Sequence, residues 1–85
     1  MKILAVDDEE LALSSLRRLL RRRGLRDVQT CNNGLQAVRI MMDHEFDVVL
    51  LDYLMPHLDG LQILEKVKPH RPATEFIMIT AVDDI

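Results

Sequence analysis

The chain has 85 residues, of which 48% are hydrophobic and 29% charged, with three glycines and three prolines. This length is below the usual domain size of about 100–150 residues, so we expect one domain at most, or part of one. The composition is typical of a globular protein and excludes a disordered or fibrous chain. The net charge of −3, together with 4% aromatic residues and no tryptophan, argues against a nucleic-acid-binding surface, which needs basic groups and stacking rings.

Short apolar runs alternate with amphipathic segments along the whole chain. In chain order, the pattern predicts a strand over residues 2–6, a helix over 11–23, a weaker strand over 27–31, a helix over 35–42, a strand over 46–51, a helix over 60–68 and a strand over 74–80. Gly24 is expected to end the first helix, Asp59 to cap the third, and Arg71-Pro72 to end it. Strands that alternate with helices predict right-handed crossovers and a parallel α/β sheet.

Each predicted helix has an apolar face. The residues expected to turn toward the core are Leu13, Leu16 and Leu20 with Ala12 and Leu19 in the first helix, Leu35, Val38, Ile40 and Met41 in the second, and Leu61, Leu64 and Val67 in the third. The chain ends on a strand with no helix after it. Because a parallel sheet is normally covered on both faces, we expect the last strand to leave an open edge and one face of the sheet to be incompletely covered.

The arginines gather in one basic block, which consists of Arg17, Arg18, Arg21, Arg22, Arg23 and Arg26. One explanation is the solvated face and C-terminal end of a helix, where cations complement the helix dipole. The other is a docking surface for an acidic partner. The sequence leaves both interpretations open.

Nothing in the sequence predicts contact with a membrane. The longest apolar runs, residues 3–6 and 48–51, are far shorter than the roughly 18 residues that span a bilayer, and no signal-peptide pattern follows Met1. Cys31 is the single cysteine and cannot form an intrachain disulfide, which suits a reducing compartment. We therefore expect a cytoplasmic protein.

Acidic residues follow two strands of the predicted sheet. The first strand is followed directly by Asp7-Asp8-Glu9-Glu10, and the third by Asp52. In the order 2-1-3-4 these strands are neighbours at the point where the winding reverses, which is where open α/β sheets bind ligands. We therefore expect the carboxylates of Asp7, Asp8 and Asp52 to meet in one crevice. Clustered carboxylates repel one another unless a hard cation neutralises them, so the group favours Mg²⁺.

Each of these acids also has an ordinary explanation. Asp7 or Asp8 can cap the first helix, whose first turn suits acidic side chains, and Asp52 can be a turn residue after a strand. Cys31 is expected to be a small core residue rather than a reactive thiol, and His57 a solvated loop residue.

Five motifs stand in one order across nearly the whole chain. They are Ile3-Leu4-Ala5-Val6-Asp7-Asp8-Glu9, Asn32-Asn33-Gly34 with Ala37, Asp47-Val48-Val49-Leu50-Leu51-Asp52, Met55-Pro56 with Asp59-Gly60, and Ile77-Met78-Ile79-Thr80-Ala81. In order and spacing the set resembles the receiver domain of two-component response regulators. The resemblance implies a flavodoxin-like doubly wound parallel sheet of strand order 2-1-3-4 that lacks the fifth strand and the last helices. Residues 1–85 would then form one receiver domain, incomplete at its C-terminus.

The resemblance also implies roles for individual residues. Asp52 matches the aspartate that accepts a phosphoryl group, and Thr80 matches the switch hydroxyl. Asp7, Asp8, Asp52 and the backbone carbonyl of Leu54 match the Mg²⁺ ligands. The implied function is a phosphorylation-dependent signalling switch whose partner is a sensor histidine kinase or a phosphotransfer protein. Since the first strand begins next to Met1, we expect the N-terminal receiver of a response regulator.

The chain departs from the family pattern in two respects. It ends after four strands, so the lysine and the switch aromatic of the family's fifth strand are missing. Position 54, which is often polar in the family, is leucine. Because this side chain cannot orient a hydrolytic water, we expect slow self-dephosphorylation.

Three other functions stay open at this point. Asp7 or Asp8 could be the nucleophile of an aspartate phosphatase, with Glu9 as the second acid. Flavin or nucleotide binding is disfavoured, because an acidic run repels phosphate unless a metal intervenes. A truncated receiver could also serve only as a self-association module through the open edge of its fourth strand. In the signalling interpretation we expect self-phosphorylation and self-dephosphorylation at most, without turnover of other small molecules.

Overall fold

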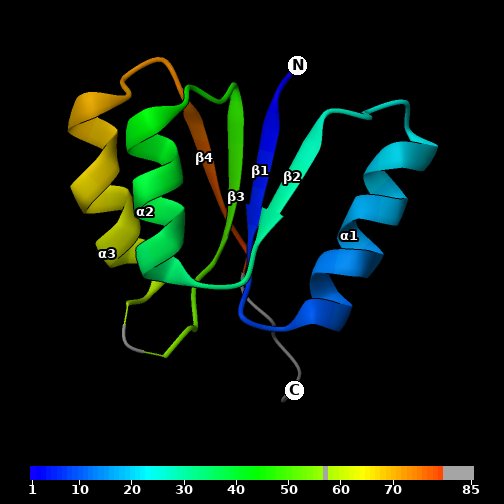
Figure 1. Ribbon diagram of the computed structural model, residues 1–85, viewed down its shortest axis with the longest axis horizontal. Helices are drawn as coiled ribbons and strands as arrows, with labels where there is room; N and C mark the ends of the chain where they lie inside the picture. Colours follow the sequence, from blue (N-terminus) through cyan, green and yellow to red (C-terminus); the bar gives the residue numbers. More distant parts are fainter. Residues whose placement is uncertain (57, 80–85) are drawn as a thin grey trace.

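The computed structural model describes residues 1–56 and 58–79, which form a four-stranded sheet with helices on both faces (Figure 1). Its elements are β1 (Ile3–Val6), α1 (Glu10–Arg22), β2 (Val28–Cys31), α2 (Gly34–Asp43), β3 (Val48–Asp52), α3 (Gly60–Val67), the short 3-10 helix η1 (Lys68–His70) and β4 (Glu75–Ile79). Every predicted element is present, with bounds that shift by one or two residues.

All strand pairs are parallel, and the strand order is β2-β1-β3-β4. This confirms the predicted doubly wound sheet, and no fifth strand occurs within residues 1–56 and 58–79. Val6, the last residue of β1, pairs with Cys31 of β2 on one side and with Leu51 of β3 on the other. The carboxyl ends of the three strands therefore lie together at one edge of the sheet.

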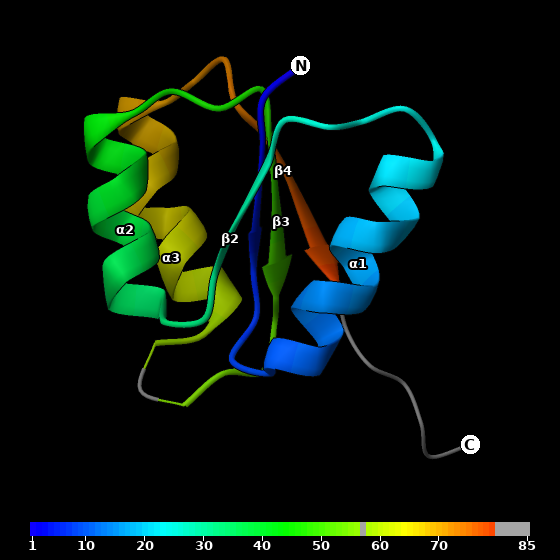
Figure 2. The same ribbon diagram turned by 45° about the vertical axis from the view of Figure 1, so that its right-hand side comes forward.

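Helices α2 and α3 cover one face of the sheet and α1 covers the other, as the two views together show (Figures 1 and 2). The larger apolar cluster lies on the face of α2 and α3, where Leu4, Val49, Leu51 and Ile63 are completely buried. Burying a side chain of this size stabilises the fold by roughly 1.5–3 kcal/mol. The smaller cluster, on the face of α1, contains Leu13. Most of the packing free energy thus comes from the α2–α3 face.

The helix ends follow the predicted chemistry. Gly24 has a φ of +85°, a conformation that favours glycine, and it terminates α1. Asp59 caps α3 by accepting a hydrogen bond from the amide of Gln62, whose side chain accepts one from the amide of Asp59. The α-helical part of α3 ends at Val67, before the predicted break at Arg71-Pro72, because Pro69 has no N–H to continue the ladder.

Three leucines predicted to face the core are exposed instead. The exposed fractions are 50% for Leu19, 61% for Leu35 and 44% for Leu61. In α3 the buried face consists of Gly60, Ile63 and Val67, a helical repeat that is displaced from Leu61. The helical spacing of the apolar residues therefore predicted the helices correctly, but it placed these three leucines on the buried face, which was wrong.

The outer strand β4 is buried on one face only. Phe76 and Met78 pack against the larger cluster, whereas Ile77 and Ile79, which point to the other face, are 50% and 40% exposed. Within the described part of the chain, α1 is the single helix on that face, and β4 pairs with β3 alone. This confirms the expectation of an incompletely covered face and an open edge.

Among residues 1–56 and 58–79, no helix has the length and apolar character needed to cross a bilayer.

Candidate functional site

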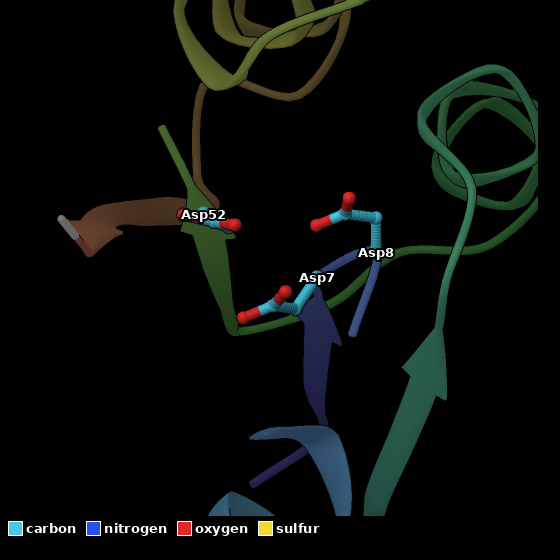
Figure 3. A group of neighbouring side chains, drawn as sticks. All are labelled: Asp7, Asp8 and Asp52. Atoms are coloured by element: carbon cyan, nitrogen blue, oxygen red, sulfur yellow. The ribbon is translucent and has the colours of Figure 1, made fainter. Parts of the chain in front are cut away.

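Three carboxylates meet at the carboxyl edge of the sheet. Asp7 and Asp8 follow β1, and Asp52 is the last residue of β3. One carboxylate oxygen from each residue lies within 4.8 Å of the other two. Figure 3 shows the three side chains turned toward a common space, with Asp7 and Asp52 partly buried and Asp8 exposed. The structure therefore brings together the three acids that the sequence places after neighbouring strands.

Backbone pairing fixes the positions of Asp7 and Asp52. The amide of Asp7 donates to the carbonyl oxygen of Cys31 over 3.1 Å, which extends the β1–β2 ladder by one residue. The amide of Tyr53, directly after Asp52, donates to the carbonyl oxygen of Ile79 over 3.0 Å. Each acid is thus held by the strand next to its own, and both carboxyl groups are set by the sheet rather than by a free loop.

Asp7 supports the turn that leads into α1 instead of capping the helix. Its Oδ1 accepts a hydrogen bond of 2.9 Å from the amide of Glu9, and Glu9 is the N-cap residue, without a side-chain capping bond. The alternative explanation, that Asp7 or Asp8 caps α1, was therefore wrong, because α1 begins at Glu10, its N-cap is Glu9, and no described side chain caps it.

Gly60, at the start of α3, lies directly against the end of β3. Its amide donates to the carbonyl oxygen of Tyr53 over 3.2 Å. A Cβ at this position would lie 2.8 Å from the carbonyl oxygen of Asp52 and 2.6 Å from Sδ of Met78. In the sequence, Gly60 was named only as the start of the third helix and as part of the motif Asp59-Gly60, and its contact with β3 was missed. Glycine is the residue that permits so close an approach of two backbone segments.

The environment of Asp52 raises its pKa above the ordinary value. Burial is the largest cause, and the negative charge of Asp7 is the second; a hydrogen bond with the Asp7 carboxyl and the charge of Asp8 act in the same direction. The amide of Leu54, 3.3 Å from Oδ1 of Asp52, lowers the pKa. Holding Asp52 ionised beside two other carboxylates therefore costs free energy unless a cation is bound.

The donor set fits a hard divalent cation. All three side chains offer carboxylate oxygens, and they lie close enough together to share one ion. The Leu54 side chain is 66% exposed, and the contact of this residue with the site is made by its backbone amide, which donates to Asp52. The role of the Leu54 carbonyl stays a prediction, and Thr80, like His57, lies outside the described residues.

Cys31, which ends β2 beside this site, is a core residue. Its side chain is buried within the larger apolar cluster, and burial raises the pKa of its thiol, although the hydrogen bond from Sγ to the Asn33 carbonyl acts in the opposite direction. A buried, protonated thiol is a poor nucleophile, which agrees with the predicted structural role.

Comparison with known proteins gives one consistent result. Residues 3–85 match the family described as "Response regulator receiver domain". The chain is 34% identical over 85 residues to "Response regulator MprA" of Mycobacterium leprae, covering 100% of this chain and 37% of that protein. It is 37% identical over 83 residues to "Transcriptional regulatory protein ZraR" of Klebsiella oxytoca, covering 98% of this chain and 18% of that protein.

A solved structure shares the fold over nearly the whole chain. It is a CheY-like response regulator receiver domain protein from Methanospirillum hungatei, 27% identical, with a TM-score of 0.88, and the match covers 99% of this chain and 66% of that one. The chain therefore spans well under half of these curated relatives and two thirds of the solved domain. On the strength of the matched residues, the strand order and the position of the three acids, the chain belongs to the response regulator receiver domain family.

Proposed function

We propose that the chain is a phosphorylation-dependent signalling switch that accepts a phosphoryl group on Asp52 from a sensor histidine kinase or a phosphotransfer protein. The observation that carries this proposal is the meeting of Asp52 with Asp7 and Asp8 at the carboxyl edge of the sheet. Membership of the receiver family supports the same assignment.

Asp52 is the acceptor in this mechanism. One of its carboxylate oxygens attacks phosphorus in line, a new oxygen–phosphorus bond forms, and the bond between phosphorus and the donor atom breaks, so that the donor leaves with the bonding electrons. The hydrogen bond from the Leu54 amide to Oδ1 orients the carboxylate, and the ladder bonds around it limit its movement. Positioning of this kind is the main contribution of a protein to phosphoryl transfer.

Asp7, Asp8, Asp52 and the backbone carbonyl of Leu54 would hold Mg²⁺ at the site. The cation would supply charge neutralisation for the phosphoryl oxygens. The chain itself supplies the carboxylates, and burial, followed by the charge of Asp7, raises the pKa of Asp52. A bound cation would offset both effects by stabilising the ionised carboxylate. Without a cation, this cluster of carboxylates would also repel the anionic phosphodonor.

The output of the switch would pass through the end of β4. The hydrogen bond between the Tyr53 amide and the Ile79 carbonyl ties the residue after Asp52 to the residue before Thr80. We propose that Thr80 supplies the hydroxyl that responds to phosphorylated Asp52, so that the end of β4 has two states.

The regulated process would lie in the rest of a longer polypeptide. The matched segment makes up 37% of the relative described as a response regulator and 18% of the one described as a transcriptional regulatory protein. We propose that the chain is the N-terminal receiver of such a regulator and works in the cytoplasm.

The proposal is tested by labelling with acetyl phosphate in the presence of Mg²⁺, followed by intact-mass measurement. The native chain should gain one phosphoryl group, Asp52→Asn should gain none, and Asp43→Asn, an exposed acid at the end of α2, should behave as the native chain. Labelling of Asp52→Asn at the native rate would refute the proposal and would favour Asp7 or Asp8 as nucleophile.

Self-association through β4 is the second candidate. Ile77 and Ile79 are half-exposed on the uncovered face, and the outer edge of β4 has no partner strand among the described residues. Unpaired strand edges are templates for pairing. A concentration-dependent dimer that Ile77→Lys abolishes would favour this candidate, whereas a monomer at all concentrations would exclude it.

A further inference from the structure

A hollow of about 250 Å³ lies between α1 and β2. It is distinct from the carboxylate site, with which it shares no residue. Its polar lining consists of Ser14, Arg17, Arg18, Arg21, Thr30 and, at one end, Glu10. We call this hollow the arginine pocket.

Arg17 is held in place at the arginine pocket. Its Nη2 donates to the carbonyl oxygen of Val28 and to Oγ1 of Thr30, each over 3.3 Å. Both acceptors are neutral, so these bonds fix the guanidinium without compensating its charge. The side chain therefore reaches from α1 to β2 as a pre-positioned cation.

The helix dipole accounts for only part of this basic surface. Arg21 and Arg22 lie in the last turn of α1, where cations are stabilised by the dipole, an effect that falls off within one turn. Arg17 and Arg18 lie one turn earlier and are outside its reach. Three guanidinium groups around one hollow repel one another unless anions lie between them, and Glu10 is the one carboxylate among the described residues that line it.

We propose that the arginine pocket binds a compact phosphorylated small molecule with at least two negative charges. Guanidinium groups match phosphate oxygens with paired hydrogen bonds, and the hydroxyls of Ser14 and Thr30 can donate to further oxygens. The volume is just below the range of roughly 300–1,000 Å³ typical of drug-sized ligands, so the ligand is small.

Glu10 makes the charge of the arginine pocket asymmetric. It lines one end of the hollow, and its carboxylate accepts a hydrogen bond from Nδ2 of Asn32, which holds it there. A fixed negative charge at this end repels a polyanion that extends along the whole groove, such as an acidic peptide. The arrangement therefore favours a ligand whose charge is confined to the arginine end.

The test is a titration of the 85-residue chain with inorganic pyrophosphate, monitored by isothermal titration calorimetry. The buffer is metal-free, so that no cation can bridge pyrophosphate to the carboxylate site. Two variants with the same net charge are compared: Arg18→Gln/Arg21→Gln inside the pocket and Arg22→Gln/Arg23→Gln outside it. We expect a submillimolar Kd, a loss of about tenfold or more in the first variant, and a change of less than about twofold in the second.

Three results would overturn the proposal. An equal loss in both variants would show general charge attraction, and a Kd above about 10 mM for the native chain would show that no site exists. Tighter binding of an oligoglutamate peptide than of pyrophosphate would assign the surface to an acidic protein partner. Thermal unfolding of both variants checks that neither change disturbs the fold.

Discussion

Asp52 and Gly60 are in direct backbone contact: a Cβ at position 60 would lie 2.8 Å from the carbonyl oxygen of Asp52. Real Cβ atoms do not approach a carbonyl oxygen this closely, so glycine allows α3 to begin against the end of β3. The position of the proposed phosphoryl acceptor therefore depends on a residue that carries no functional group.

Replacing Gly60 by alanine should displace the end of β3. We expect Gly60→Ala to lower the free energy of unfolding by about 1–3 kcal/mol, as overpacking does in a tight core, and to slow phosphorylation of Asp52 by acetyl phosphate. Gly24→Ala is the control. Alanine in the positive-φ conformation of Gly24 should lower stability by about 1 kcal/mol or more, but Gly24 follows the end of α1 and does not adjoin Asp52. Equal labelling rates in the two variants would contradict a positioning role for Gly60.

Replacing Asp52 by asparagine should stabilise the metal-free chain at neutral pH. The pKa of Asp52 is raised in the folded state, so its contribution to stability is full below its unfolded pKa, near 3.8, and is lost as the pH rises through its folded pKa. Asp52→Asn removes this loss. We expect its Tm at pH 7 to exceed that of the native chain by up to about 4 °C, a limit set by the partial exposure of the carboxyl.

The same comparison has two internal checks. The difference in Tm should shrink as the pH falls toward 3.8, because the folded Asp52, whose pKa is raised, takes up its proton above that pH. Mg²⁺ at pH 7 should raise the Tm of the native chain more than that of the variant. If the native chain is the more stable one at pH 7 without metal, the raised pKa assigned to Asp52 from burial and the neighbouring carboxylates is wrong.

Replacing Leu54 by glutamine should speed the loss of the phosphoryl group. Leu54 is exposed beside Asp52, and an apolar side chain there cannot orient an attacking water, whereas an amide can. We expect a several-fold faster decay of the phosphorylated Leu54→Gln chain, measured by intact mass after removal of the phosphodonor. Leu54→Ala is the control, and an equal acceleration in both variants would attribute the effect to access alone.

Replacing Arg71 by alanine should loosen the packing of α2. Nε of Arg71 donates to the carbonyl oxygen of Met41 over 2.9 Å and Nη2 donates to that of Met42 over 3.0 Å, which satisfies carbonyls at the C-terminal end of α2. We expect Arg71→Ala to cost about 1–3 kcal/mol in urea unfolding. Arg39→Ala, on the exposed face of α2, should change stability by less than about 0.5 kcal/mol; equal losses would contradict the capping role.

The fold was largely predictable because the apolar patterns, the turn residues and the helix caps all predict the same strands and helices. The apolar strands, the glycine at position 24 and the cap at Asp59 depend on local chemistry, which the sequence displays directly. The exposure of Leu35 and Leu61 was not predictable, because the apolar residues of α2 and α3 fit two neighbouring helical faces. Ile63 is completely buried, and only the packing of α3 on the sheet selects its face.

The candidate site was predictable from strand ends and strand order, since these alone bring Asp7, Asp8 and Asp52 together. The turn that Asp7 closes on Glu9 was missed, because a capping bond and a turn use the same residue types at nearly the same spacing. The contact of Gly60 with Asp52 was also missed, because it depends on the distance between α3 and the sheet. The role of Thr80 stays a prediction.

The central claim, that Asp52 takes a phosphoryl group at a divalent-cation site formed with Asp7 and Asp8, is tested most directly by locating the phosphoryl group. The chain is incubated with acetyl phosphate with and without Mg²⁺, digested, and its peptides are mapped by mass spectrometry. We predict a phosphoryl group on Asp52 in the presence of Mg²⁺, with little in metal-free buffer and little for Asp8→Asn. A phosphoryl group on another residue, or equal labelling of Asp52 without a divalent cation, would contradict the account.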